Sequence, residues 1–270
     1  LFKGNKFYKI DITNKTGLEK IFKENKIFAI FHLAGLSKLT ESFKKKDLYK
    51  KNNILGTKNL IDLTKKYKIK YFIFSSSASV YGKPKIFPIR ESNILKPISY
   101  YGKTKYIAEQ LIKKECTKKS FKSICLRYFN VIGSNYKNKI GEIHNPPIHL
   151  IPIFIKNILL NKPLQIRSNF NTKDRSGIRD YIDVNDMTNA HYLSLKEITK
   201  IKKNFLAINL GSRKHYSVKE IIKIIAKLIK KKNIKLIFSK KLEGEPDKLI
   251  ASGSMAYKTL RWKPKTNIKK

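Results

Sequence analysis

The residues of this sequence best suited to proton transfer are a serine run and a tyrosine–lysine pair. The run 75–77 is Ser-Ser-Ser and closes a short apolar segment, and Tyr101 and Lys105 lie four residues apart further along. On a helix this spacing puts both side chains on one face. A tyrosine whose pKa is about 10 is a poor base at neutral pH, but a nearby ammonium favours its phenolate. Tyr101 is therefore a candidate base, and Ser77 could share its proton.

The Tyr-x-x-x-Lys spacing alone is not specific, because lysine is so abundant that chance produces several matches. The pattern occurs at 81–85, 101–105 and 192–196. Tyr81 precedes a glycine and a proline, which predicts a loop, and Tyr192 lies within a helix expected in the second half. Tyr101 follows a strand that ends in serines and begins its own helix, so its context favours it.

The elements that must position these residues alternate through the first half of the chain. Apolar runs predict strands at 7–10, 29–33, 71–75 and 123–129. Apolar residues spaced three and four apart predict helices at 16–25, 49–66 and 100–118. A β-α-β succession predicts an α/β fold with a parallel, doubly wound sheet, which binds ligands beyond the carboxyl ends of its strands.

The second half is less regular. Its patterns predict a helix at 149–160, short strands at 164–167 and 205–210, and a helix at 218–231. We expect one domain over 1–130 and a smaller α/β lobe over 131–270, with some segments of the lobe returning to the first domain. No linker separates the halves, so we expect them to share a cleft.

Composition restricts the possible partners. The formal net charge is +41, but lysine is spread along the whole chain and only seven residues are arginine. This spread favours compositional bias over a specific nucleic-acid surface, although a basic scaffold for polyanions is an alternative. No apolar stretch approaches the roughly 20 residues that span a bilayer. Two cysteines suit a reducing cytoplasm, and the histidines have no metal-ligand spacing, so no metal is expected.

Four segments together resemble a known family. They are YFIFSSSASVYG at 71–82, SYYGKTK at 99–105, LRYFNVIG at 126–133 and GIRDYIDV at 177–184. Their order and spacing are similar to those of the extended short-chain dehydrogenase/reductase family, over about residues 7–264. The resemblance implies a Rossmann-like domain and is strongest to members that epimerise UDP-sugars at C4, which form homodimers through the helices expected here at 49–66 and 100–118.

The resemblance also implies roles for individual residues. It implies that the catalytic residues are Ser77, Tyr101 and Lys105. It implies that NAD is contacted by Asp11, Ile12, Leu33, Ala34, Gly35, Asn53, Tyr101, Lys105 and Tyr128. It implies that the UDP-sugar is contacted by Ser77, Tyr101, Phe129, Asn130, His149, Leu150 and Arg179.

The implied reaction interconverts UDP-glucose and UDP-galactose. Tyr101 removes the proton of the sugar 4-hydroxyl while C4 loses a hydride to NAD. The resulting 4-keto sugar rotates and is reduced on its other face. Dehydration is disfavoured, because Ala78 follows the serines where a dehydratase has a carboxylate. Epimerisation of other UDP-sugars and decarboxylation remain alternatives.

The sequence departs from the family pattern in three places. It contains no Gly-rich turn of the kind that binds a pyrophosphate, so we expect about fifty further residues upstream, as in a fragment of a longer enzyme. Ser37 stands at a usual lysine position and Leu242 at a usual arginine position. A catalytically incomplete remnant is therefore a third hypothesis.

Overall fold

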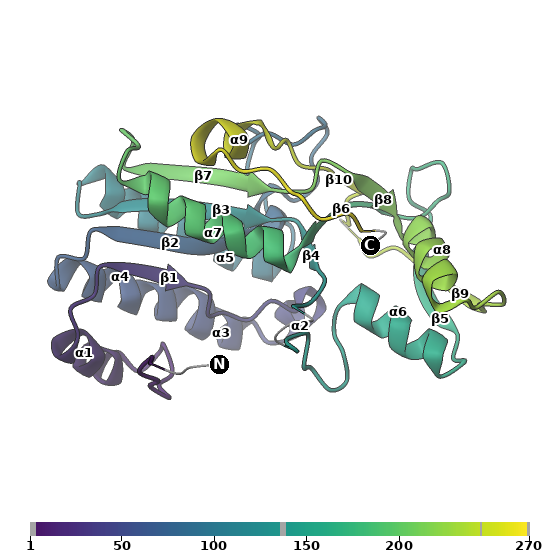
Figure 1. Ribbon diagram of the computed structural model, residues 1–270, viewed down its shortest axis with the longest axis horizontal. Helices are drawn as coiled ribbons and strands as arrows, with labels where there is room; N and C mark the ends of the chain where they lie inside the picture. Colours follow the sequence, from purple (N-terminus) through teal and green to yellow (C-terminus); the bar gives the residue numbers. More distant parts are fainter. Residues whose placement is uncertain (1–3, 136–138, 244, 269–270) are drawn as a thin grey trace.

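The computed structural model describes residues 4–135, 139–243 and 245–268 (Figure 1). Its first sheet contains four parallel strands in the order β1-β2-β3-β7. The bounds are β1 (Ala29–His32), β2 (Tyr71–Ser77), β3 (Lys122–Tyr128) and β7 (Phe205–Leu210). Parallel strands require crossover connections, and helices supply them here. The predicted parallel α/β fold is confirmed.

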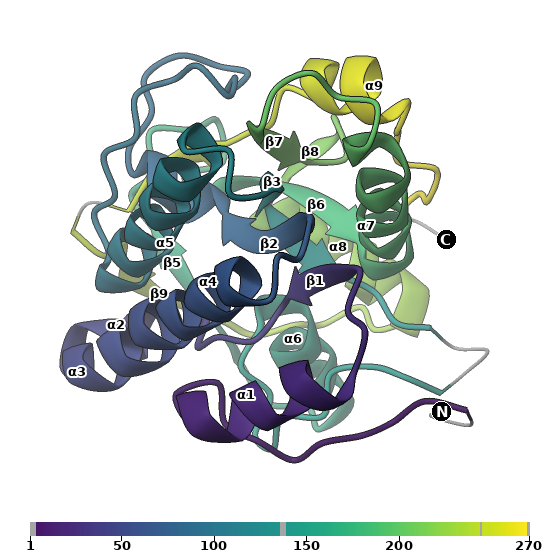
Figure 2. The same cartoon turned by 90° about the vertical axis from the view of Figure 1, so that its left-hand side faces the viewer.

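Helices cover both faces of this sheet, because successive strand residues point to opposite sides. In β2, Phe72 and Phe74 pack with α1, α4 and α5, whereas Ile73 packs with α7 and α9. Viewed along the strands, α4 and α5 lie on one side and α7 and α9 on the other (Figure 2). The helices are α1 (Lys15–Glu24), α4 (Gly56–Lys66), α5 (Tyr100–Thr117), α7 (Val184–Ile198) and α9 (Ser254–Leu260). The sheet is therefore doubly wound.

The helix predicted at 49–66 is divided in the structure. It consists of the end of α3 (Lys46–Tyr49), a π-helical segment η1 (Lys50–Leu55), and α4. A short helix α2 (Leu39–Lys44) precedes α3. Such π segments often occur at functional sites, and this one places the buried Asn53 below the loop that follows β1.

The remaining strands and helices lie beyond the carboxyl ends of the first sheet (Figure 1). One sheet has the order β10-β6-β4, with β8 also pairing with β6, and the other pairs β5 with β9. Their bounds are β4 (Asn130–Ile132), β5 (Leu164–Ser168), β6 (Ile178–Asp183), β8 (His215–Ser217), β9 (Leu236–Lys240) and β10 (Lys248–Leu249). Two helices, α6 (Leu150–Leu159) and α8 (Val218–Ile229), share an apolar core with them.

Two sequence predictions differ from the structure. Residues 7–10 form no strand, and the Phe7 side chain is 72% exposed. Within the described residues, β1 pairs only with β2, and 7–10 pairs with no strand. The strand at 205–210 belongs to the first sheet rather than to the smaller lobe, which makes it one of the expected returning segments. No helix in the described ranges is long and apolar enough to cross a bilayer.

Candidate active site

The end of β2 and the start of α5 bring Ser77 and Tyr101 together. Ser77 caps the short 3₁₀ helix η2 (Ala78–Tyr81), and its Oγ accepts a hydrogen bond from the Ser79 N–H at 3.2 Å. The Ser99 Oγ caps α5 by accepting from the Gly102 N–H at 3.0 Å. A Cβ on Gly102 would lie 2.6 Å from the Ser79 carbonyl oxygen, so glycine lets α5 approach η2 closely. This contact positions the Tyr101 side chain to hydrogen-bond with Ser77.

The pKa of Tyr101 differs from the sequence-based expectation. Burial raises it above its ordinary value, and the hydrogen bond with Ser77 lowers it only in part. The Lys105 ammonium donates instead to the Ser75 carbonyl oxygen at 2.8 Å and lies 4.9 Å from the centre of the Phe74 ring. Burial lowers the pKa of Lys105 to about 8, although Glu109 opposes this. Lys105 therefore does not by itself depress the pKa of Tyr101 in this structure.

The loop after β1 lies against Lys105. Its residues Leu33, Ala34 and Gly35 are exposed. A Cβ on Gly35 would lie 3.1 Å from the Asn53 Oδ1 and 3.4 Å from the Lys105 Nζ. The Asn53 amide accepts from the Leu36 N–H at 2.8 Å and donates to the Leu36 carbonyl oxygen at 3.0 Å. Asn53 therefore holds this loop in place.

Tyr128, at the end of β3, is paired with a histidine that the sequence analysis missed. Its hydroxyl lies 2.5 Å from the His191 Nε2, and the His191 Nδ1 lies 2.9 Å from the Met187 carbonyl oxygen. A carbonyl can only accept, so Nδ1 carries the proton and Nε2 accepts from Tyr128. Burial raises the pKa of Tyr128, a hydrogen bond with Ser75 lowers it in part, and nearby Tyr101 raises it further. Tyr128 thus lies beside the Ser77–Tyr101 pair.

A second missed group is a buried ion pair directly behind the serine run. The Arg127 guanidinium binds both carboxylate oxygens of Glu109, at 3.0 and 2.7 Å. The Ser76 hydroxyl donates to Glu109 at 2.5 Å, and Arg127 donates to the Tyr81 hydroxyl at 2.8 Å. Glu109 follows Lys105 by four residues, as Lys105 follows Tyr101. Charged residues repeated along one helix face could have signalled this network.

Two predicted substrate contacts follow β3. The Asn130 Nδ2 donates to the Asp180 carbonyl oxygen at 3.1 Å, which joins β4 to β6 through a side chain as well as through the ladder. The Phe129 ring is only 8% exposed and packs in a small core with Val80 and Ile89. The structure therefore places the Phe129 side chain in the interior rather than at an open surface.

Three residues with predicted nucleotide contacts have other partners in the described structure. They are Arg179, Asp11 and Ile12, and no hydrogen bond joins them to Ser77 or Tyr101 there. The Arg179 side chain, on β6, is 12% exposed, and its guanidinium pairs with Glu245 at 3.2 Å. The exposed Asp11 carboxylate accepts from the Thr13 N–H at 2.7 Å. The Ile12 side chain packs on Gly56 of α4, where a Cβ would lie 2.5 Å from it.

His149 and Leu150 mark the start of α6. His149 is the N-cap residue of this helix, and its Nδ1 lies 2.8 Å from the Glu142 carboxylate. Leu150 is half-buried against the apolar core shared by α6 and α8. The structure thus gives His149 a partner that the sequence did not predict.

The residues around Lys105 fit the ribose of a nicotinamide dinucleotide. An ammonium has three N–H donors, and in the described structure the Lys105 Nζ donates to a single carbonyl oxygen. The remaining donors suit the hydroxyls of a ribose, and the exposed backbone of 33–35 runs beside them. Lys105, Gly35 and Tyr101 would hold this part of the cofactor.

A profile of the NAD dependent epimerase/dehydratase family matches residues 2–211. The chain belongs to this family. It is 38% identical over 262 residues to the UDP-glucose 4-epimerase of Lactobacillus helveticus, covering 96% of this chain and 79% of that enzyme.

Solved structures agree with this assignment. The Bifidobacterium longum UDP-glucose 4-epimerase in complex with NAD+ and UDP is 33% identical, with a TM-score of 0.90 over 97% of this chain and 79% of that one. A UDP-N-acetylglucosamine 4-epimerase from Methanobrevibacter ruminantium is 28% identical, with a TM-score of 0.81 over 96% of this chain and 77% of that one.

Proposed function

We propose that this protein is an NAD-dependent isomerase that interconverts UDP-glucose and UDP-galactose. The observation that carries the proposal is the placement of Tyr101, at the start of α5, beside Ser77 at the end of β2, with Lys105 one helical turn further along α5. The 38% sequence identity to the UDP-glucose 4-epimerase of Lactobacillus helveticus, over 96% of this chain, supports the same substrate pair.

Each residue has a part in the reaction. Bound NAD would supply the hydride acceptor and donor for C4 of the sugar, and Lys105, Gly35 and Tyr101 would hold its ribose. Tyr101 takes the proton of the 4-hydroxyl and gives it back, while Ser77 holds the same oxygen by a hydrogen bond. Lys105 would orient the cofactor ribose through the N–H donors that it does not use on the Ser75 carbonyl oxygen. The 4-keto sugar between the two transfers rotates, which exposes its opposite face.

The smaller lobe holds the nucleotide. Arg179 suits the diphosphate, because its planar fork binds two phosphate oxygens at once. Glu245 pairs with Arg179 in the described structure. When the diphosphate binds, its oxygens would either displace the Glu245 carboxylate from Arg179 or lie next to it. Asn130, His149 and Leu150 complete the UDP-sugar side, and Leu33, Ala34, Asn53, Asp11 and Ile12 form the NAD side. These NAD contacts lie within the proposed division 1–130, and the UDP-sugar contacts named here, apart from Asn130, lie within 131–270.

A related activity is the second candidate, because this chain also superimposes on a UDP-N-acetylglucosamine 4-epimerase. Comparing kcat/KM for UDP-galactose with kcat/KM for UDP-N-acetylgalactosamine separates the two functions. A preference for the first by at least about tenfold supports the proposal, and the reverse preference replaces it. Absence of turnover with either sugar would favour the remnant hypothesis.

We also propose that the protein is a cytoplasmic homodimer that pairs through segments 49–66 and 100–118. Leu48, in α3, and Leu55, the last residue of the Lys50–Leu55 segment, are 42% and 44% exposed. Apolar side chains of this kind are typical of a dimer interface. Sedimentation equilibrium tests the pairing: the protein should have twice the chain mass, and Leu55→Lys should shift it towards the monomer.

A further inference from the structure

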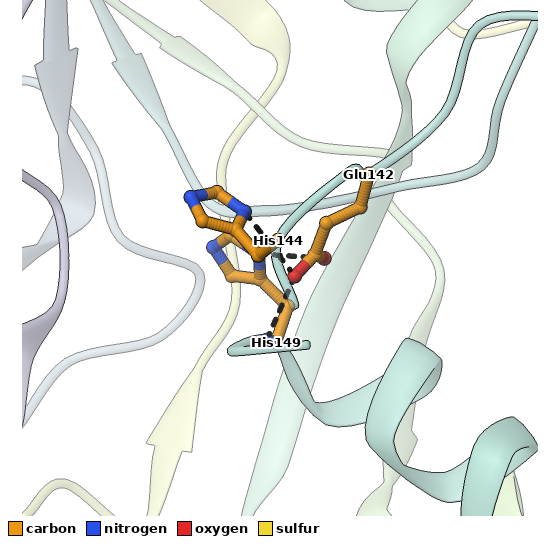
Figure 3. A group of neighbouring side chains, drawn as sticks. All are labelled: Glu142, His144 and His149. Carbon is orange, nitrogen blue, oxygen red and sulfur yellow. Dashed lines mark hydrogen bonds and ion pairs between the residues drawn. The ribbon is translucent and has the colours of Figure 1, made fainter. Parts of the chain in front are cut away.

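Two histidines and a glutamate meet in the loop that precedes α6. Glu142, His144 and His149 are the three residues, and their side chains converge on one point (Figure 3). The imidazole Nδ1 of His149 lies 2.8 Å from one carboxylate oxygen of Glu142, and that of His144 lies 3.5 Å from the other. This group does not include Ser77 or Tyr101, and it shares His149 with the proposed UDP-sugar side.

The geometry of the donor atoms suits a small metal ion. One ligand atom from each side chain can be chosen so that all three lie within 4.8 Å of one another. Ligands at about 2 Å from a tetrahedral zinc ion lie about 3.3 Å apart, so small rotations of the side chains would complete the site. Both histidine side chains are 54% exposed, which leaves room for water as a further ligand.

The electrostatics of the carboxylate are also suitable. The Ile148 N–H donates to the Glu142 carboxylate at 2.9 Å. Although the chain contains 60 lysines and arginines, the described ion-pair partners of Glu142 are both histidines. No described lysine or arginine therefore pairs with its negative charge.

We propose that Glu142, His144 and His149 bind one zinc ion. Two imidazoles and one carboxylate are donors that zinc accepts readily, whereas calcium and magnesium prefer oxygen ligands alone. Zinc would link Glu142 to His149 across the loop and fasten it at the start of α6. No metal was predicted from the sequence, because the spacing Glu-x-His-x-x-x-x-His matches no zinc motif. The conformation of the loop that precedes α6 brings the three side chains together.

Zinc titration by calorimetry, on protein without a polyhistidine tag and freed of metal, tests the proposal. We expect saturation at one zinc per chain, and binding weakened at least about tenfold in both His144→Ala and Glu142→Gln. His215→Ala is the matched control, since His215 is exposed but lies in β8, away from the cluster. Both cysteines are buried, so they do not compete for the metal.

A second measurement separates a ligand set from loose association. Cobalt added in place of zinc should give visible absorption bands in the wild type and in His215→Ala, and these bands should be lost in His144→Ala. Thermal melting without metal verifies that each variant is folded. The proposal is wrong if zinc does not saturate below about 1 mM, or if His144→Ala and Glu142→Gln bind as tightly as the wild type.

Discussion

The Glu109–Arg127 ion pair offers the sharpest test of how the site is supported. The two side chains are 1% and 4% exposed and make two hydrogen bonds to each other. Glu109→Gln preserves the shape and an acceptor for Ser76 but leaves the Arg127 charge buried without its partner. Removing one member of a buried pair costs about 3–5 kcal/mol, so we expect the free energy of unfolding to fall by about that amount.

A double-mutant cycle checks this reasoning by urea denaturation. Arg127→Met alone should also be costly, whereas Glu109→Gln combined with Arg127→Met should cost less than the sum of the single changes by at least about 2 kcal/mol. Glu197→Gln is the control, because its ion pair with Lys200 lies on the surface and should be worth less than about 1 kcal/mol. A loss below 1 kcal/mol in Glu109→Gln, or strict additivity in the cycle, would refute the account.

Two further predictions concern the site itself, and a third concerns the buried His32 at the end of β1. Tyr101→Phe should lower kcat by about 10²–10⁴-fold while leaving the unfolding free energy nearly unchanged; an active variant would exclude Tyr101 as the base. Gly102→Val should lower both kcat and stability, by about 1–3 kcal/mol in urea, because its Cβ would lie 2.6 Å from the Ser79 oxygen. Burial lowers the pKa of His32 to about 3. In the unfolded chain His32 binds a proton near pH 6.5, whereas in the folded protein it stays neutral down to about pH 3. The free energy of unfolding should therefore fall by about 3 kcal/mol between pH 6.5 and 4. His32→Gln should abolish that part of the pH dependence, and an unchanged acid profile would contradict it.

The periodic segments of the first half were predictable from sequence. Strand 71–75 and helix 100–118 correspond to β2 and α5, since their apolar patterns and flanking polar residues are strong local signals. The strand expected at 7–10 is absent, because a strand requires a partner that local sequence cannot guarantee. The small strands β4, β6 and β10 were missed because they have only two to six residues each and form through long-range pairing.

The site was predicted unevenly for a similar reason. Ser77, Tyr101 and Lys105 were found because their spacing and context are local. The partner of the neighbouring Tyr128 was not predicted. His191 reaches Tyr128 only because α7 packs on the sheet. The sequence analysis also expected a lowered pKa for Tyr101, whereas burial raises it. Burial depends on the whole fold, and the sequence alone gave no measure of it.

The most direct test of the proposed function follows the hydrogen at C4. The protein, supplied with NAD and UDP-galactose in deuterated water, should form UDP-glucose, and nuclear magnetic resonance should show no deuterium at C4. That result is expected because the same hydride leaves and returns while Tyr101 exchanges only the hydroxyl proton. Deuterium at C4, or no UDP-glucose from folded protein, would contradict the account.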